Sequence, residues 1–338
     1  MSIKAIKIIR PLCVGYRDVG MGPHYTNKQR NRVKLIFNPS SGAIKESPLQ
    51  LMDVIKEMQA CKFVPEPYLT EPDSDYTEIV QDAIEQGIRM FVVCGGDGTV
   101  SSVARAMVGT TATLGIIPTG TQNNVALSLG IPTEILAAIA LLRKGRRIKA
   151  DVGLVTCGNR TSPFLEICSV GLFSALFSSG DDIQHGELSR IGDFLSTLTT
   201  SSPSKIHLLL DDKKEIEDFG HVVLVSNMPY IGRHYQVGSE DSFRDGLLDV
   251  LFCGDIPKLE LMIGYLMKLP DGADNPRIQH FRVKNVVIDT QPPMPVMADG
   301  IDLEKGSVRI GIQRHALTIM AGPLANNEIT GSGETLEK

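Results

Sequence analysis

The chain has 338 residues, of which 42% are hydrophobic and 22% charged, and its formal net charge is −5. This balance is typical of a globular protein long enough for two domains, and the negative net charge argues against broad nucleic-acid binding. The longest apolar helical run, 135–142, is far shorter than the ~20 residues that a membrane span needs. The six cysteines are scattered without a Cys-x-x-Cys pair, which favours buried, reduced thiols in a cytoplasmic protein.

Residues 1–31 read as an N-terminal extension to which the sequence assigns no role. From 32 to 148, apolar strands alternate with helical runs, which predicts an α/β domain with a parallel sheet and helices on both faces. The strands are expected at 33–38, 68–70, 90–94 and 113–118, and the helices at 49–58, 100–108 and 135–142. Asp73 or Ser74 is expected to cap the helix that ends at Gly87, and Thr133 the helix that ends near Gly145.

A loop of small residues follows three of these strands. Glycine lets the backbone approach a ligand closely, and turn amides beside a helix N-terminus favour phosphate. In a parallel sheet such loops emerge at the carboxyl ends of the strands, the usual ligand edge. One strand–Gly-Gly–helix junction can be only a tight turn, but three such loops favour a nucleotide site. The loops are Asn38-Pro39-Ser40-Ser41-Gly42, Gly95-Gly96-Asp97-Gly98-Thr99 and Thr119-Gly120-Thr121-Gln122-Asn123-Asn124.

From residue 151 onward the pattern changes to short β-type runs separated by turn residues. This spacing predicts a mainly antiparallel β-sandwich domain over 149–325, followed by a disordered polar tail over 326–338. A helix is expected to interrupt the strands at 256–268. The strands are expected at 152–157, 206–210, 221–226, 248–252, 281–289, 307–312 and 317–320.

The three loops resemble, in order and spacing, the nucleotide-loop motifs of the diacylglycerol kinase catalytic family, which includes bacterial lipid kinases, sphingosine kinases and ceramide kinases. The Gly-Gly-Asp-Gly-Thr motif alone is also similar to NAD kinases, which act on a soluble substrate. The combination with Asp245-Gly-Leu-Leu-Asp249 favours the lipid-kinase side. The resemblance extends over roughly 32–322 through the segments Phe164-Leu-Glu-Ile-Cys-Ser-Val-Gly171, Val223-Leu-Val-Ser-Asn227, Phe243–Val250 and Ala298-Asp299-Gly300.

The resemblance implies ATP-dependent phosphorylation of a lipid hydroxyl, with diacylglycerol or a related lipid as acceptor, in a cleft between the domains. Mg²⁺ is expected to bridge the phosphates, with Asp97 near the ion or its waters. Asp151 lies where relatives place another acid, although from the sequence it is equally a turn residue at a strand start. The residues that match ATP contacts are Asn38, Pro39, Ser40, Ser41, Gly42, Thr70, Gly95, Gly96, Asp97, Gly98, Thr99, Gly120, Thr121 and Asn123.

In bacterial relatives the loop that matches 242–249 holds a structural magnesium ion. Carried over, this implies that Asp245 binds the metal through its carboxylate, and that Ser242 and Leu247 bind it through backbone carbonyls. Without the resemblance, Asp245-Gly246 between two strands is a turn signal.

The chain departs from the family where the family carries acids. Asn124 and Ser174 stand where relatives usually have aspartate, and Ile301 stands where a glutamate serves as general base. We expect Asp299 beside the acceptor hydroxyl. Asp302 follows, and on a strand it would face away from the position of Ile301, whereas in a turn it can reach inward. The alternative function is therefore a catalytically weak or inactive nucleotide- or lipid-binding homologue that has lost the general base.

The expected partner is a lipid substrate at a membrane surface, contacted peripherally by a cytoplasmic protein. The basic run Arg143-Lys-Gly-Arg-Arg-Ile-Lys149 can touch anionic headgroups, or it can simply place cations at a helix C-terminus, which the helix dipole favours. A homodimer is expected as well, and nucleic acid is not expected as a partner.

Overall fold

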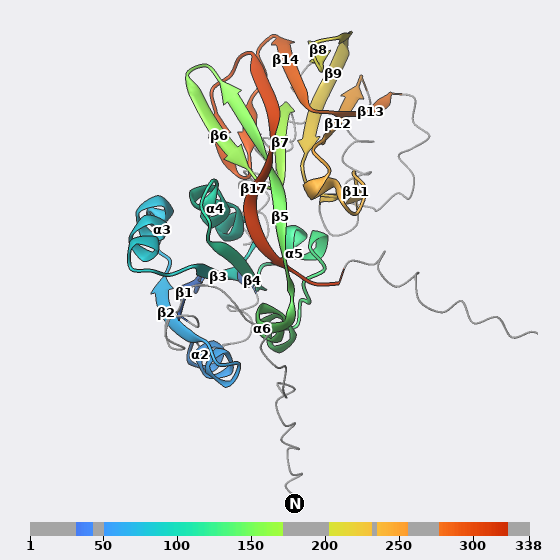
Figure 1. The fold of residues 1–338 in the computed structure, drawn as a ribbon. Helices are drawn as coiled ribbons and strands as arrows, with labels where there is room; N and C mark the ends of the chain where they lie inside the picture. The colour runs from blue at the N-terminus through green and yellow to red at the C-terminus, as the bar shows by residue number, and fades with distance from the viewer. Residues whose placement is uncertain (1–31, 43–50, 172–202, 232–234, 256–276, 324–338) are drawn as a thin grey trace, which may run out of the picture.

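The computed structural model describes residues 32–42, 51–171, 203–231, 235–255 and 277–323. In its first half, strands and helices alternate along the chain (Figure 1). The elements are β1 Arg32–Phe37, α2 Leu51–Ala60, β2 Val64–Leu69, α3 Tyr76–Glu85, β3 Met90–Gly95, α4 Asp97–Met107, β4 Thr113–Pro118, α5 Asn124–Ser128 and α6 Ile135–Lys144.

The strands of this half form the expected parallel sheet, and the structure gives their order as β2-β1-β3-β4. Alternate residues of β3 face opposite sides, because successive side chains of a strand point to opposite faces. Phe91 and Val93 belong to the core beneath α3, α4 and α5, whereas Val92 and Cys94 belong to the core beneath α2 and α6. Helices therefore cover both faces, and β3 is hydrophobic throughout because both of its faces are buried.

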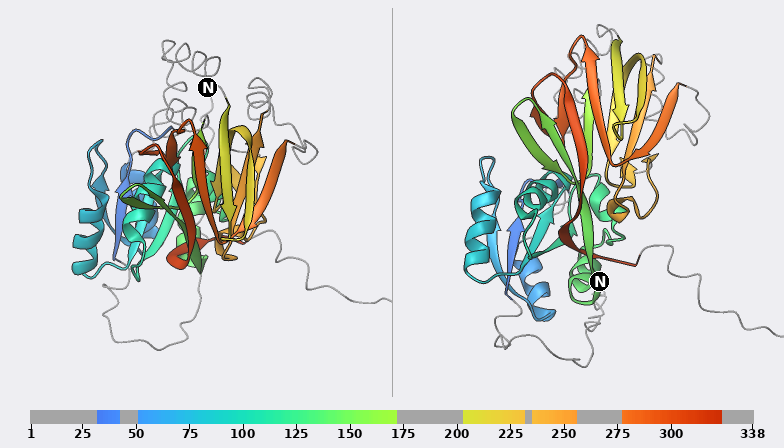
Figure 2. Two further views of the ribbon diagram at one scale, coloured as in Figure 1. Left: turned by 90° about the horizontal axis from the view of Figure 1, so that it is seen from above. Right: turned by 45° about the horizontal axis from the view of Figure 1, so that its top comes forward.

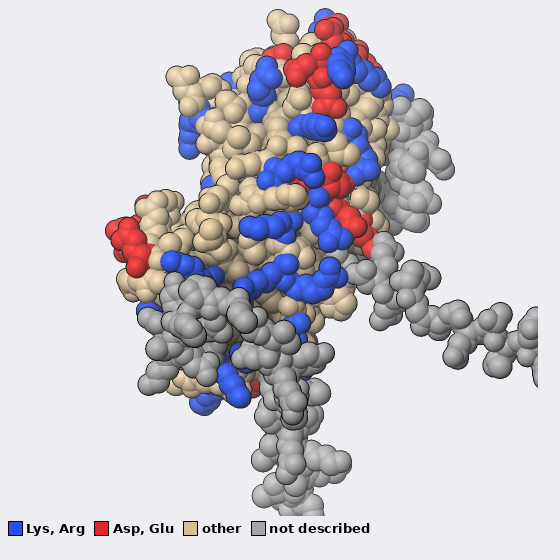
Figure 3. All heavy atoms as spheres, in the orientation of Figure 1, with Lys and Arg blue, Asp and Glu red and all other residues tan. Residues whose placement is uncertain are grey.

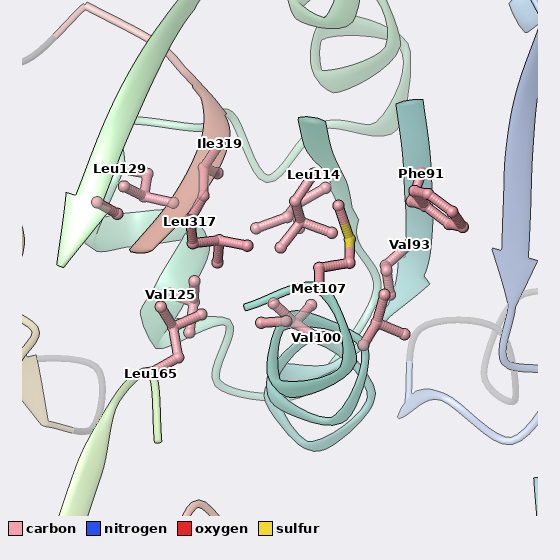
Figure 4. Close-up of a cluster of buried hydrophobic side chains, with 14 of the residues drawn as sticks. Phe91, Val93, Val100, Met107, Leu114, Val125, Leu129, Leu165, Leu317 and Ile319 are labelled. Atoms are coloured by element: carbon pink, nitrogen blue, oxygen red, sulfur yellow. The ribbon is translucent and has the colours of Figure 1, made fainter. Parts of the chain in front are cut away.

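Figure 4 shows the first of these two cores. Val100 and Met107 of α4 pack between Leu114 of β4 and Val93 of β3. The buried residues of α4 include Val100, Val103, Ala104 and Met107, the three- and four-residue spacing that places side chains on one helix face. This packing fixes the start of α4 at the end of β3, where the second glycine loop lies.

The strands of the second half are mainly antiparallel (Figure 2). Their buried side chains form a hydrophobic core separate from those of the first half. Two long strands, β5 and β17, pair with each other and run through both halves, so one sheet extends across the described chain. The elements are β5 Arg146–Cys157, β6 Arg160–Phe164, β7 Ile167–Gly171, β8 Ser204–Leu210, β9 Lys214–Ser226, β10 Tyr230–Ile231, β11 Tyr235–Gln236, the 3₁₀ turn η1 Ser242–Arg244, β12 Leu248–Gly254, β13 Ile278–Val283, β14 Asn285–Gln291, β15 Val296–Ala298, β16 Ile301–Leu303 and β17 Val308–Ala321.

The pairing of β17 corrects the sequence prediction. The two runs expected at 307–312 and 317–320 form one strand with a register shift between Gln313 and Leu317. Beyond that shift, Thr318 and Ile319 pair in parallel with β4, so the chain's last described strand completes the first domain's sheet. Conversely, the single strand expected at 281–289 divides at Lys284 into β13 and β14, which pair with different partners.

Two helix caps also differ from the prediction. The carboxylate of Asp75, rather than Asp73 or Ser74, accepts hydrogen bonds from the amides of Thr77 and Glu78. Glu134, rather than Thr133, caps α6 in the same way. The expected helix at 256–268, the tail from 326, the extension 1–31 and Ser174 lie outside the described residues.

Candidate active site

The loops after β1, β3 and β4 lie against one another at the carboxyl edge of the parallel sheet. The Asn38 side chain in the first loop donates a hydrogen bond to the hydroxyl of Thr99, the last residue of the second loop (2.9 Å). The buried Thr119 hydroxyl in the third loop donates to the Ser41 hydroxyl in the first (2.9 Å). The structure thus joins side chains from three segments that are far apart in the sequence.

Glycine allows the second and third loops to touch backbone to backbone. A Cβ atom built on Gly120 would lie 2.5 Å from the Gly96 Cα, and one built on Gly42 would lie 2.9 Å from the Thr121 hydroxyl oxygen. At Gly120 the contact is with backbone and leaves no room for a side chain, so glycine is needed there for close approach rather than for an unusual φ angle.

The N-terminus of α4 is open to a ligand, whereas that of α5 is closed. No side chain caps α4 behind its N-cap Gly96, so its first-turn amides can bind an anion. The Asp97 carboxylate instead accepts hydrogen bonds from the amides of Asn124 and Val125 (3.1 Å each). Asp97 therefore caps α5 and leaves α4 as the helix that offers its amides to an anion.

Two further predicted residues support the loops. Asn123 has a left-handed backbone (φ 58°), and its side-chain amide makes two hydrogen bonds with the backbone of Gly120 (2.9 and 2.7 Å), which tightens the third loop. Thr70 follows β2, and its amide donates to the Phe37 carbonyl (2.9 Å), so it lies one strand outward at the same edge.

The Asp299 carboxylate binds the backbone of the segment that links β6 to β7. It accepts hydrogen bonds from the amides of Leu165 (2.6 Å), Glu166 (3.1 Å) and Ile167 (2.9 Å). These contacts hold the link between β6 and β7 against the β15–β16 turn. Within the described chain the Asp299 carboxylate thus serves as an acceptor for backbone amides.

Ile301 and Asp302 lie on opposite sides of β16. Asp299 and Gly300 have positive φ angles (42° and 77°) and form a two-residue turn, after which Ile301 pairs with Ala298. Ile301 is half-buried, and Asp302 is exposed opposite Met297. The backbone at Asp302 is therefore a strand rather than a turn. Its side chain faces the side opposite to that of Ile301, so it does not replace a base at position 301.

Glu166 is a site residue that sequence reasoning missed. Its side chain is 8% exposed and accepts a hydrogen bond from the Asn124 side-chain amide (2.7 Å). It belongs to the link that Asp299 holds, so it brings the second half of the chain into contact with the third nucleotide loop. An acid within the apolar run Phe164-Leu-Glu-Ile-Cys168 was the available signal.

The three acids at this junction share an unfavourable environment for negative charge. Burial is the main cause that raises the pKa of Asp97, Glu166 and Asp299. The pKa of Glu166 rises well above its ordinary value, because repulsion from Asp97 and Asp299 adds to burial. Arg105, whose Nε donates to the Pro163 carbonyl (3.1 Å), partly offsets the rise at Asp299.

Asp151 lies within β5 and is fully buried, so it is not a turn residue. Its carboxylate accepts hydrogen bonds from the amides of His315 (2.7 Å) and Gly246 (2.8 Å). It thereby fixes the bulge of β17 and the loop that precedes β12. The described contacts give Asp151 a structural role at the junction.

The predicted metal residues do not present a free carboxylate. Asp245 forms an ion pair with Arg282, and its other oxygen accepts from the Leu247 amide (2.8 Å). Arg282 also lies 3.6 Å from the buried Asp249. A guanidinium therefore already balances the charge of this loop. Among the described residues, no group of three or more His, Cys, Asp or Glu side chains could hold a metal ion. The predicted site has a different donor set, one carboxylate and two backbone carbonyls, so the metal site at Ser242, Asp245 and Leu247 stays a prediction.

Comparisons with known proteins place these features in a family context. The model of the diacylglycerol kinase catalytic domain matches residues 32–155, and that of the YegS C-terminal NAD kinase beta sandwich-like domain matches residues 180–321. An uncharacterized protein of Synechocystis is 26% identical over 314 residues, which are 87% of this chain and 70% of that protein.

Relatives named diacylglycerol kinase match the first half of the chain. That of Staphylococcus saprophyticus is 34% identical over 127 residues, and that of Staphylococcus carnosus is 32% identical over the same length. In both, the match spans 37% of this chain and 41% of the relative. A crystal structure of a putative diacylglycerol kinase from Bacillus anthracis matches with a TM-score of 0.67 at 24% identity, covering 87% of this chain and 98% of that one, which establishes a shared fold.

Proposed function

Because the chain belongs to the bacterial diacylglycerol kinase-like family of lipid kinases, we propose that it is an ATP-dependent lipid kinase. It would transfer the γ-phosphate of ATP to the hydroxyl of diacylglycerol or a related lipid. The observation that carries the proposal is the meeting of three glycine- and hydroxyl-bearing loops beside the uncapped N-terminus of α4. Phosphoryl transfer depends mainly on positioned charge, and this arrangement supplies amide donors for a triphosphate.

Magnesium would accompany the nucleotide and neutralise charge on its phosphates. Asp97 is the first residue of α4, so it would lie beside the bound phosphates while holding the start of α5. In this proposal, Asp97 acts on the nucleotide mainly by fixing the third loop against the second. It would interact with the hydrated ion through the electrostatic field of its carboxylate.

A second candidate is a nucleotide- or lipid-binding homologue with weak or no transfer activity. The specific observation in its favour is the β15–β16 turn, where the Asp299 carboxylate is occupied by three amides and Ile301 cannot accept a proton. General-base assistance typically contributes about 10²–10⁴-fold, so its loss would slow transfer without preventing nucleotide binding.

A labelled-ATP assay against a panel of lipid alcohols separates the two candidates. The kinase proposal expects Mg²⁺-dependent transfer of label to diacylglycerol or a related lipid. Binding of Mg–ATP with no transfer to any lipid on the panel supports the second candidate instead. Absence of Mg–ATP binding contradicts both.

Restoring a carboxylate at residue 301 tests the role of the turn. We expect Ile301→Glu to raise transfer at least about tenfold, because this half-buried position adjoins the Asp299–Gly300 turn and a glutamate there can accept the hydroxyl proton. The exposed neighbour provides the matched control: Asp302→Glu should leave the rate unchanged. Equal rates for Ile301→Glu and the unaltered chain would contradict a base position at 301.

Contact with the lipid surface is proposed to use a basic face. Arg143, Arg146, Arg147 and Lys149, at the end of α6 and the start of β5, are all exposed. None of the four forms an ion pair with a described residue. Figure 3 shows Lys and Arg gathered over this part of the molecule, in a chain whose net charge is −5. Basic residues near a surface attract anionic lipids. The described residues contain no helix long and apolar enough to cross a membrane.

Sedimentation with lipid vesicles tests this face. Vesicles of phosphatidylcholine with about 30% phosphatidylglycerol should bind the chain, and binding should weaken as salt is raised, because salt screens exposed charges. The variant Arg146→Glu/Arg147→Glu should lose most of this binding. Lys56→Glu/Lys213→Glu makes the same change in net charge elsewhere and should retain it. Equal loss in both variants would contradict a specific basic face.

A further inference from the structure

The hydrogen bond between Asn124 and Glu166 joins the two halves of the chain at the nucleotide loops. Asn124 is the first residue of α5 and ends the third loop, whereas Glu166 lies between β6 and β7. Both side chains are buried, with 6% and 8% of their surfaces exposed, and the bond is 2.7 Å long. A short bond between a carboxylate and an amide in a buried site is one of the stronger side-chain contacts.

Each partner of this bond is itself held by a carboxylate. The amide of Asn124 donates to Asp97, and the amide of Glu166 donates to Asp299. The carbonyl of Glu166 also accepts from the amide of Asn227 (3.0 Å). A continuous series of contacts therefore runs from the β15–β16 turn, through Glu166 and Asn124, to the start of α4.

A second carboxylate across this bond would add negative charge where burial and two neighbouring acids already disfavour it. Asp97 from α4 and Asp299 from the β15–β16 turn already face Glu166, and among the described groups Arg105 is the cation that acts on Asp299. The side-chain oxygen Oδ1 of Asn124 is buried without a partner, so the side chain contributes only its Nδ2 donor to this contact. Aspartate at 124 would oppose Glu166 with a like charge.

We infer that Glu166 is a positioning residue, which holds Asn124 and thereby sets the third nucleotide loop against the β-sandwich half of the chain. The inference rests on the proposed function, because its consequence is alignment of bound ATP with the acceptor. The contact requires one carboxylate and one carboxamide. Either residue 124 or residue 166 can carry the carboxylate, provided that the other carries the carboxamide.

An exchange of the two groups tests the inference. Glu166→Ala removes the contact and should lower kcat by about 100-fold, while Glu166→Gln keeps a weaker neutral bond and should lower it by about tenfold. Asn124→Asp places two carboxylates together and should be as impaired as Glu166→Ala. The double variant Asn124→Asp/Glu166→Gln reverses the pair and should recover at least about tenfold over Asn124→Asp. Glu217→Gln, in an exposed ion pair with Lys205, is the control and should behave as the unaltered chain.

The melting temperature of Glu166→Gln, compared with its kcat, distinguishes a positioning role of Glu166 from a purely structural one. Because the pKa of Glu166 is raised in the folded state, its ionisation costs stability as pH rises through that pKa. Glu166→Gln carries no such charge. We expect its melting temperature to equal or exceed that of the unaltered chain at about pH 8, while its kcat is lower. A purely structural residue would lower both together.

The outcomes distinguish this inference from the proposed function. An unaltered chain that binds no Mg–ATP contradicts both. If the unaltered chain binds Mg–ATP without transferring phosphate, the Kd for Mg–ATP replaces kcat as the readout for the same variants. An active or binding chain whose Glu166→Ala variant is unchanged contradicts the inference alone. A double variant no better than Asn124→Asp contradicts it as well.

Discussion

Replacing Gly120 with alanine is expected to reduce Mg–ATP binding and phosphate transfer by at least about 100-fold. The added Cβ would lie 2.5 Å from the Gly96 Cα and 2.9 Å from the Asn123 Oδ1, so the second and third loops must separate. Backbone cannot yield as a side chain does, and a displacement of about 1 Å in a site can cost about 10²-fold in rate. Calorimetry with Mg–ATP and the labelled-ATP assay measure the two effects.

Two other glycines provide controls for Gly120→Ala. A Cβ on Gly311 would meet its nearest neighbour, the Lys284 carbonyl oxygen, at 3.9 Å, so Gly311→Ala should bind Mg–ATP normally. A Cβ on Gly98 would meet no protein atom within 4 Å. Gly98→Ala should therefore fold with an unchanged melting temperature and weaken binding only through contact with the nucleotide. Normal nucleotide binding by Gly120→Ala would show that contact between the loops does not form the site.

Replacing Asp97 with alanine is expected to reduce phosphate transfer strongly and to lower stability. The carboxylate accepts from two amides at the start of α5, and their loss leaves two donors without a protein partner. Such a loss costs about 1–3 kcal/mol, which corresponds to a fall of a few degrees in melting temperature for a chain of this size. Transfer should fall by more than about 100-fold, because the third loop is released and a charge beside the nucleotide is removed.

Asp97→Asn separates the two roles of this residue. Its side-chain oxygen can still accept one of the two amides, so most of the stability should return. Transfer should remain low, because the negative charge is absent. If Asp97→Asn transfers phosphate at the rate of the unaltered chain, the charge of Asp97 has no part in the reaction.

Local sequence patterns located most strands and the glycine loops of the first half. The strand at 113–118 was predicted to the residue, and the glycine loops after β1, β3 and β4 were located correctly. These features depend on short-range causes: apolar runs buried on both faces, and glycine where the backbone must turn or be approached. Even the meeting of the loops followed from the rule that parallel strands end at one edge.

Local sequence patterns could not predict which strands pair when they are far apart in the chain. Nothing in residues 317–321 indicates that they join β4, more than 190 residues earlier in the chain, because a buried strand looks the same whichever partner it finds. Glu166 escaped prediction for a related reason. Its role arises from Asn124 and Asp299, which approach it only in the folded chain. Conversely, the sequence suggested that Asp299 lies beside the acceptor hydroxyl. In the structure its carboxylate accepts hydrogen bonds from backbone amides.

A crystal structure with a non-hydrolysable Mg–ATP analogue tests most directly whether the three loops form one triphosphate site. We predict phosphate oxygens within hydrogen-bond distance of the first amides of α4, with residues of the 38–42 and 120–123 loops contacting the same nucleotide. An analogue bound away from α4, or touching only one of the three loops, would contradict a shared triphosphate site.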